Sequence, residues 1–179
     1  MKTNVHKEGF RPRTSSMRAP QEIRTFFVTA VAWQRRSIFR AEPMAQLFLD
    51  TLQRYRIQKK FLLHEFVLMP DHFHLLLTPA PDVSLEKCAQ LIKGGFSFRV
   101  KKDLGSKLEI WEKGYAEHRV KDATDYERHA EYIRENPVRA GLVERASDYP
   151  YSSECRPSEI DPTPPWLKPA QLAGLASPR

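Results

Sequence analysis

The chain has 179 residues, enough for one domain with a hydrophobic core and too few for two comfortable ones. It carries 29 lysines and arginines against 22 acidic residues, so its net charge of +7 favours a polyanionic partner. Nucleic acid is the commonest partner of this kind, and an anionic membrane surface is the alternative. Two cysteines exclude a disulfide framework, and no apolar stretch approaches the roughly 18 residues of a membrane span. We therefore expect a cytoplasmic protein with no membrane partner.

The first half of the chain alternates between strand and helix patterns. Residues 1–20 are rich in Arg, Pro and Ser and are interpreted as a basic, flexible arm. Residues 22–33 are rich in β-branched and aromatic side chains and predict a strand, whereas the helical spacing of apolar residues after Pro43 predicts a helix. Two further strands, 61–69 and 72–79, are separated by a Pro-Asp turn and therefore predict a hairpin.

The second half adds two helices and a strand. Ser84 is placed to cap an amphipathic helix, and residues 108–122 predict a further strand or an irregular hairpin. Thr124, with a glutamate three residues later, has the pattern of a helix start, and Pro137 is expected to end that helix near Asn136.

The order of these elements predicts the fold class. The first six elements, β-α-β-β-α-β, have the order of a ferredoxin-like split βαβ unit. We expect an α+β domain over residues 21–153, in which an antiparallel sheet has helices packed on one face and a last helix is added. The Pro-rich residues 154–179 are expected to form a loosely attached C-terminal tail. This fold hosts many functions, so the function has to be argued from the site.

A pair of histidines interrupts the third predicted strand. Side chains alternate along a strand, so His72 and His74 point to one face while Phe73, Leu75 and Leu77 point to the other. Two imidazoles on one strand face can bind the same divalent ion, provided that a third ligand comes from elsewhere. The alternative is that both histidines are exposed on a solvated face of the sheet.

The last predicted helix offers a nucleophile and a further ligand. Tyr132 lies away from the centre of the core-facing stripe, and Arg128 and Asn136 lie one helical turn to either side of it. If this helix packs beside the histidine strand, the tyrosine hydroxyl can attack a phosphodiester that a metal polarises. The alternatives are half-buried packing for Tyr132 and a C-cap for Asn136.

Three segments resemble the single-tyrosine HUH transposases, most closely the branch of REP-associated tyrosine transposases. They are EFVLMPDHFHLLLTP (65–79), IWEKGYAEHRVKDATDY (110–126) and YIRENPVRAGLV (132–143), and the resemblance covers residues 22–153. It implies a ferredoxin-like domain that uses Mg²⁺ or Mn²⁺ to cleave and rejoin single-stranded or hairpin DNA. The attacking tyrosine leaves a 5′-phosphotyrosine link and a free 3′-hydroxyl. Because the implied partner is DNA, we also expect the protein to associate with the nucleoid. We expect it to act as a monomer or as a homodimer.

The motif positions carry roles over to this sequence. The resemblance makes His72 and His74 metal ligands and makes Tyr132 the nucleophile. Asn136 takes the position of the helix-borne third ligand, where many insertion-sequence relatives have Gln. One alternative function is that of a hairpin-binding protein without catalysis. Another is that of a metal-dependent hydrolase that uses water as the nucleophile.

Two other tyrosines and several basic residues complete the candidates. Tyr115 occupies a position where relatives often carry Phe or Trp, and Tyr126 fits the core stripe, so Tyr132 is preferred as the nucleophile. His118 is also typical of the family and is interpreted as structural, whereas His129 is interpreted as a packing or surface residue. The candidates for contact with DNA phosphates are Arg24, Arg35, Lys93, Arg99, Lys121 and Arg128.

Overall fold

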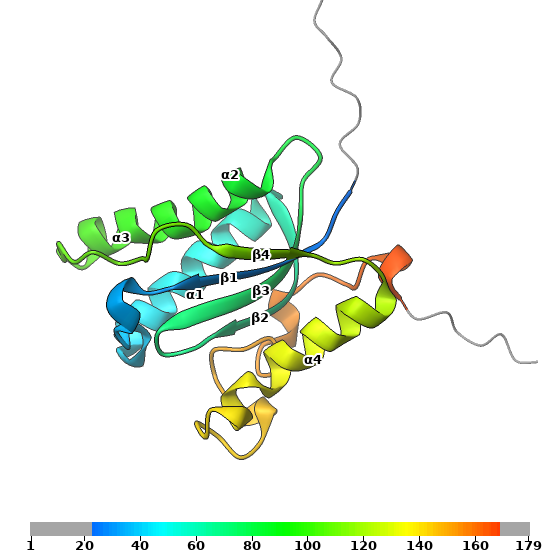
Figure 1. The fold of residues 1–179 in the computed structure, drawn as a ribbon. Helices are drawn as coiled ribbons and strands as arrows, with labels where there is room; N and C mark the ends of the chain where they lie inside the picture. Colours follow the sequence, from blue (N-terminus) through cyan, green and yellow to red (C-terminus); the bar gives the residue numbers. More distant parts are fainter. Residues whose placement is uncertain (1–22, 169–179) are drawn as a thin grey trace, which may run out of the picture.

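A four-stranded antiparallel sheet forms the centre of the computed structural model, which describes residues 23–168 (Figure 1). The strands are β1 (Phe26–Val31), β2 (Phe61–Leu68), β3 (His72–Pro79) and β4 (Ala116–Arg119), in the order β2-β3-β1-β4. The helices are α1 (Glu42–Ile57), α2 (Leu85–Ala89), α3 (Gly95–Asp103) and α4 (Ala123–Arg139). This topology confirms the ferredoxin-like prediction; the predicted arm, residues 1–20, lies outside the described residues.

The sheet separates two hydrophobic cores (Figure 1). On one face α1, α2 and α3 pack on Phe73, Leu75 and Leu77 of β3, as the alternation predicted. On the other face α4 packs on the sheet, where Leu76 of β3 meets Ile133 of α4. The even-numbered side chains of β3, including both histidines, therefore face the helix that carries the candidate tyrosine.

The predicted helix after Ser84 is confirmed but is not uniform. The Ser84 hydroxyl accepts a hydrogen bond from the backbone N–H of Lys87 at 3.1 Å, as an N-cap does. A π-helical stretch, Gln90–Gly94, then joins α2 to α3. Tyr55 of α1 packs closely against Gly95, the first residue of α3. A Cβ atom on residue 95 would lie 2.7 Å from the tyrosine hydroxyl oxygen, so a larger side chain there requires a shift.

Both ends of α4 differ from the prediction. Asp122, and not Thr124, caps the helix, because its carboxylate accepts a hydrogen bond from the backbone N–H of Asp125 at 2.9 Å. Pro137 lies inside the helix, which continues to Arg139. A proline forgoes one backbone hydrogen bond, but this proline is buried and close to the C-terminal end, where few bonds are affected.

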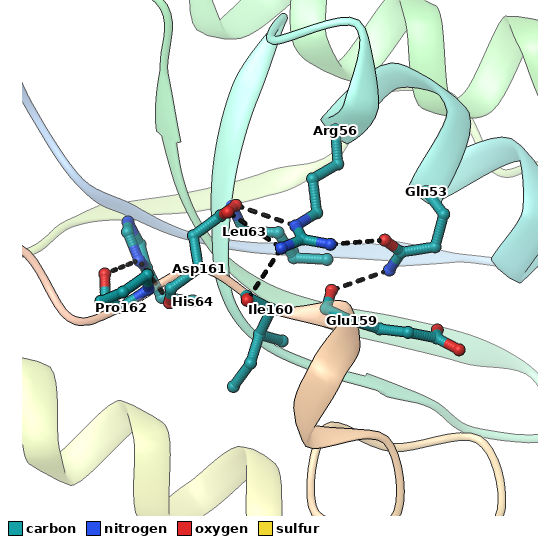
Figure 2. Close-up of polar contacts among 8 residues, drawn as sticks. All are labelled: Gln53, Arg56, Leu63, His64, Glu159, Ile160, Asp161 and Pro162. Atoms are coloured by element: carbon teal, nitrogen blue, oxygen red, sulfur yellow. Dashed lines mark hydrogen bonds and ion pairs between the residues drawn. The ribbon is translucent and has the colours of Figure 1, made fainter.

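The described part of the Pro-rich segment, residues 154–168, is anchored to the domain (Figure 2). The Asp161 carboxylate accepts hydrogen bonds from the Arg56 guanidinium at 2.9 and 3.0 Å and from the backbone N–H of Leu63 at 2.8 Å. On the neighbouring strand position, Nδ1 of His64 donates to the carbonyl of Pro162 at 2.9 Å. These residues are held by long-range contacts, which corrects the expectation of loose attachment for this part of the tail.

We expect Asp161→Asn to lower the free energy of unfolding by about 2 kcal/mol, because the neutral amide cannot form the charge-assisted pair with Arg56. Burial raises the pKa of Asp161, but the hydrogen bonds from Arg56 and Leu63 outweigh it and hold the pKa below its usual value. The stabilisation is therefore present at neutral pH and is lost as the pH falls through that lowered pKa. Urea denaturation at pH 7 and at acid pH measures both effects.

A matched control is the ion pair between Arg145 and Asp148, whose nitrogen and oxygen atoms also lie 2.9 Å apart. Both of these side chains are exposed, so Asp148→Asn should change the stability little. Equal destabilisation by the two substitutions would show that the Asp161 contact does not anchor the segment.

Candidate metal and tyrosine site

The two histidines of β3 lie side by side beneath α4. Their ring centroids are 4.8 Å apart. The Nδ1 atom of His74 lies 2.7 Å from the hydroxyl oxygen of Thr29, its partner on β1. Among residues 23–168, Nε2 of His74 is one of two buried side-chain polar atoms without a hydrogen-bond partner. Such an atom costs free energy unless a ligand takes it, so its position fits a metal ligand.

The protonation of this pair suits metal binding. Burial and the neighbouring imidazole of His72 lower the pKa of His74 to about 3, so its ring is neutral at physiological pH. The Nδ1 atom of His72 donates to the Asp71 carboxylate at 2.5 Å, so in the neutral form of the ring Nε2 is the acceptor. Arg35 contacts the same carboxylate at 3.2 Å. A carboxylate behind a histidine is the usual support of a metal ligand.

Thr29 and Asp71 belong to the site, although they were not among the residues predicted for it. Asp71 precedes His72 directly, so its proximity could have been noticed. Thr29 lies opposite His74 only because of the register between β1 and β3, for which the sequence carries no local sign.

Tyr132 faces the histidines from α4. Its ring centroid is 5.2 Å from that of His74, and the two rings meet edge to face. The tyrosine is 38% exposed, so its hydroxyl can reach a bound molecule. It borders a pocket of about 370 Å³ that is lined by Phe27, Thr29, His74, Arg128, His129 and Tyr132. Asn136 is buried one helical turn after Tyr132, on the same side of α4.

The two rival tyrosines lie in different surroundings. Tyr126 is 2% exposed, and burial raises its pKa to about 12. Tyr115 packs at the edge of the core on the other face of the sheet, and burial raises its pKa to about 12 as well. Among the tyrosines that the structure describes, Tyr132 alone has an exposed side chain, and it is the one beside the histidine pair.

Comparison with known proteins decides the family. A family model described as "Transposase IS200 like" matches residues 24–136, more than half of the chain. This chain belongs to the IS200-like transposase family. It is 29% identical over 130 residues to the REP-associated tyrosine transposase of Escherichia coli K12, covering 72% of this chain and 75% of that relative. The predicted resemblance is confirmed, and the family assigns the chain a transposase-like role in DNA processing.

A solved structure shares the fold of this transposase. It is that of a REP-associated tyrosine transposase bound to a REP hairpin, with a TM-score of 0.65 and 24% sequence identity over 97% of this chain and 95% of the other. Within residues 23–168, no helix combines the length and the apolar character that crossing a membrane requires.

Two of the basic candidates lie at the histidine and tyrosine site of the transposase. Arg128 lines the pocket, and its side chain is 72% exposed although its guanidinium contacts the Asp125 carboxylate. Arg35 lies at the other end of the site, where it pairs with Asp71 behind His72. Both guanidinium groups can therefore approach the phosphate groups of a molecule bound across the site.

The other basic candidates lie further from Tyr132. Lys93 and Arg99 belong to the helical layer on the opposite face, where Lys93 donates to the carbonyl of Glu112 at 3.0 Å and Arg99 to the hydroxyl of Thr51 at 3.1 Å. Arg24 precedes β1 at the end of the sheet away from His72. Lys121 is exposed between β4 and α4.

A second cluster of polar side chains adjoins the pocket. His118 of β4 donates from Nε2 to the Asp125 carboxylate at 2.8 Å, and His129 lies one turn further along α4. The candidate ligand atoms of these three residues all lie within 4.8 Å of one another. The same carboxylate also accepts from the backbone N–H of Lys121 at 3.0 Å and from Arg128 at 2.5 Å.

Proposed function

We propose that this transposase cleaves and rejoins single-stranded, hairpin-forming DNA through a covalent link between Tyr132 and a 5′-phosphate. The observation that carries the proposal is the exposed Tyr132 ring, 5.2 Å from a buried neutral His74 whose Nε2 atom has no hydrogen-bond partner in the described chain. The name of the Escherichia coli relative, a tyrosine transposase, and the hairpin bound to the structural neighbour support it.

His72, His74 and Asn136 would hold the metal. Two imidazole nitrogens and one amide oxygen fit a divalent ion such as Mn²⁺ or Mg²⁺. When bound, this ion would polarise the scissile phosphate as a Lewis acid. The His74 nitrogen without a partner is the feature of the site that favours such a ligand.

Tyr132 and the nearby guanidinium supply the rest of the proposed chemistry. The tyrosine oxygen attacks phosphorus, the bond from phosphorus to the 3′-oxygen breaks, and a 3′-hydroxyl is released. Arg128 in the pocket would offset the charge that develops on the phosphate oxygens. Attack by the freed or by another 3′-hydroxyl on the phosphotyrosine reverses the step and joins the strands.

The polarity of the covalent adduct tests this function. A single-stranded hairpin oligonucleotide labelled at its 3′ end is expected to transfer its label to the protein in the presence of Mn²⁺. The same oligonucleotide labelled at its 5′ end should instead release a free labelled fragment. EDTA should abolish both, because the phosphate is no longer polarised. Binding of the hairpin with neither adduct nor cleavage would favour the non-catalytic alternative.

A further inference from the structure

The hydrogen bonds of His129 fix which of its ring nitrogens carries the proton. Nδ1 lies 2.8 Å from the backbone carbonyl oxygen of Asp125. A carbonyl oxygen only accepts, so Nδ1 must donate, and in the neutral ring Nε2 is then the acceptor. Within residues 23–168 no hydrogen bond to Nε2 is formed. His129 therefore presents an unused lone pair.

The same hydrogen bonds argue against a metal in the cluster of His118, Asp125 and His129. Metal-binding imidazole nitrogens must be deprotonated. Here Nδ1 of His129 donates to a carbonyl, Nε2 of His118 donates to the Asp125 carboxylate, and Arg128 contacts that carboxylate too. The cluster is a hydrogen-bonded group that orients His129.

The His129 ring is held at the wall of the Tyr132 pocket. The His118 ring stacks on it at 4.7 Å with an interplanar angle of 26°, and Phe27 contacts it at 4.7 Å. Phe27 also contacts the rings of His74, at 5.3 Å, and of Tyr132, at 6.0 Å. His129 precedes Tyr132 by three residues, so both side chains lie on the same side of α4 and line one pocket.

We propose that Nε2 of His129 accepts the proton of the Tyr132 hydroxyl during attack on the phosphate, an inference that rests on the proposed function. As the bond from the tyrosine oxygen to phosphorus forms, the tyrosine proton moves to Nε2. The bond from phosphorus to the 3′-oxygen breaks, and that oxygen takes a proton from water. In the joining step the attacking 3′-hydroxyl gives its proton back to the solvent, and the imidazolium returns its proton to the departing tyrosine oxygen.

The charges around His129 suit a group that gains and loses a proton. The Asp125 carboxylate favours the imidazolium, since one of its oxygens lies 3.4 Å from Nδ1. The guanidinium of Arg128 on α4 opposes it, as would positive charge on His118 of β4. His74 of β3, across the pocket, stays neutral because its pKa is lowered to about 3. The base takes a proton in the forward step and returns it in the reverse step, so neither charge state of the ring can be strongly disfavoured.

His129→Ala tests the assignment through the pH dependence of adduct formation. With Mn²⁺ and excess hairpin DNA, we expect the single-turnover rate at pH 7 to fall by about 10²- to 10⁴-fold. The remaining rate should rise towards about pH 10, because hydroxide then takes the tyrosine proton in place of the missing imidazole. Added imidazole should restore part of the rate at pH 7. Mn²⁺ and hairpin affinities should stay near those of the wild type.

Two further variants keep the test decisive. His118→Ala removes a ring that touches His129 but does not line the pocket, so its rate should fall less and imidazole should not restore it. If His129→Ala does not fold, His129→Asn replaces it, because the amide nitrogen can still donate to the Asp125 carbonyl. A wild-type rate at pH 7 in the His129 variant, or a loss that neither imidazole nor high pH relieves, overturns the inference. A wild-type protein that forms no adduct overturns the proposed function itself.

Discussion

Replacing Tyr132 with phenylalanine is expected to abolish the covalent adduct, a loss on the order of 10⁶-fold in rate, comparable to removal of the nucleophile from other covalent catalysts. Only the hydroxyl is removed, so the ring keeps its contacts with His74 at 5.2 Å, Phe27 at 6.0 Å and the Arg139 guanidinium at 5.8 Å. The free energy of unfolding and the affinities for Mn²⁺ and hairpin DNA should therefore change little. A denaturing gel with 3′-labelled DNA measures the adduct, and melting curves and titrations measure the rest.

The rival tyrosines supply the matched controls for that experiment. Tyr115→Phe should retain adduct formation, because Tyr115 packs on the opposite face of the sheet. Tyr126→Phe should retain it too, since the only hydrogen bond of its hydroxyl that the structure describes comes from Thr163 at 3.3 Å. An adduct that persists in Tyr132→Phe and disappears in either control would assign the nucleophile elsewhere. Cleavage without any adduct in Tyr132→Phe would support a hydrolase that uses water.

The strand and its two faces could be predicted because the alternation is local. Residues two apart on a strand share a face wherever the strand is placed, so the sequence alone separated the histidines from Phe73, Leu75 and Leu77. The helical spacing likewise placed Tyr132 and Asn136 on one side of a helix. The sequence left open whether that side of α4 meets the histidines, because the answer depends on which face of the sheet α4 covers.

The ends of α4 could not be predicted because competing local signals overlap. Asp122 and Thr124 are both good capping residues, each followed three residues later by an acidic residue. The end of β4 at Arg119 and the short connection after it select Asp122. Pro137 is a strong stop signal in isolation, but its burial and its place near the C-terminal end of α4 let the helix continue.

Contacts between distant parts of the chain have no local signal at all. Asp161 is held by Arg56, which lies 105 residues earlier, so the anchoring of residues 154–168 could not be seen in a Pro-rich composition. The net charge of the chain likewise does not show where each basic residue lies in the fold. Lys93 and Arg99 belong to the same basic surplus as Arg128, yet the fold places them on the layer opposite α4.

Two substitutions, one of His74 and one of its neighbour Thr29, should weaken Mn²⁺ binding to different extents. His74→Ala removes a proposed ligand and should weaken Mn²⁺ binding by more than about 100-fold. Thr29→Val keeps the shape of the threonine but removes the hydroxyl 2.7 Å from Nδ1 of His74. That hydroxyl holds the ring in its orientation, and in the tautomer that a metal at Nε2 requires it accepts the Nδ1 proton. Loss of such support typically weakens metal binding by about 10- to 100-fold.

The same titration separates this site from the second histidine cluster. Mn²⁺ binding followed by calorimetry or electron paramagnetic resonance needs no DNA and no turnover, so a loss of affinity cannot be confused with a loss of catalysis. His118→Ala should leave the Mn²⁺ affinity unchanged, because Nε2 of His118 is a donor to Asp125 and not a free acceptor. If the affinity instead falls in His118→Ala and survives in His74→Ala, the metal belongs to the cluster at the start of α4, and His129 would be its ligand and not the base. The partnerless Nε2 atom of His74 favours the first outcome, because a metal there satisfies a buried nitrogen that the fold otherwise leaves without a partner.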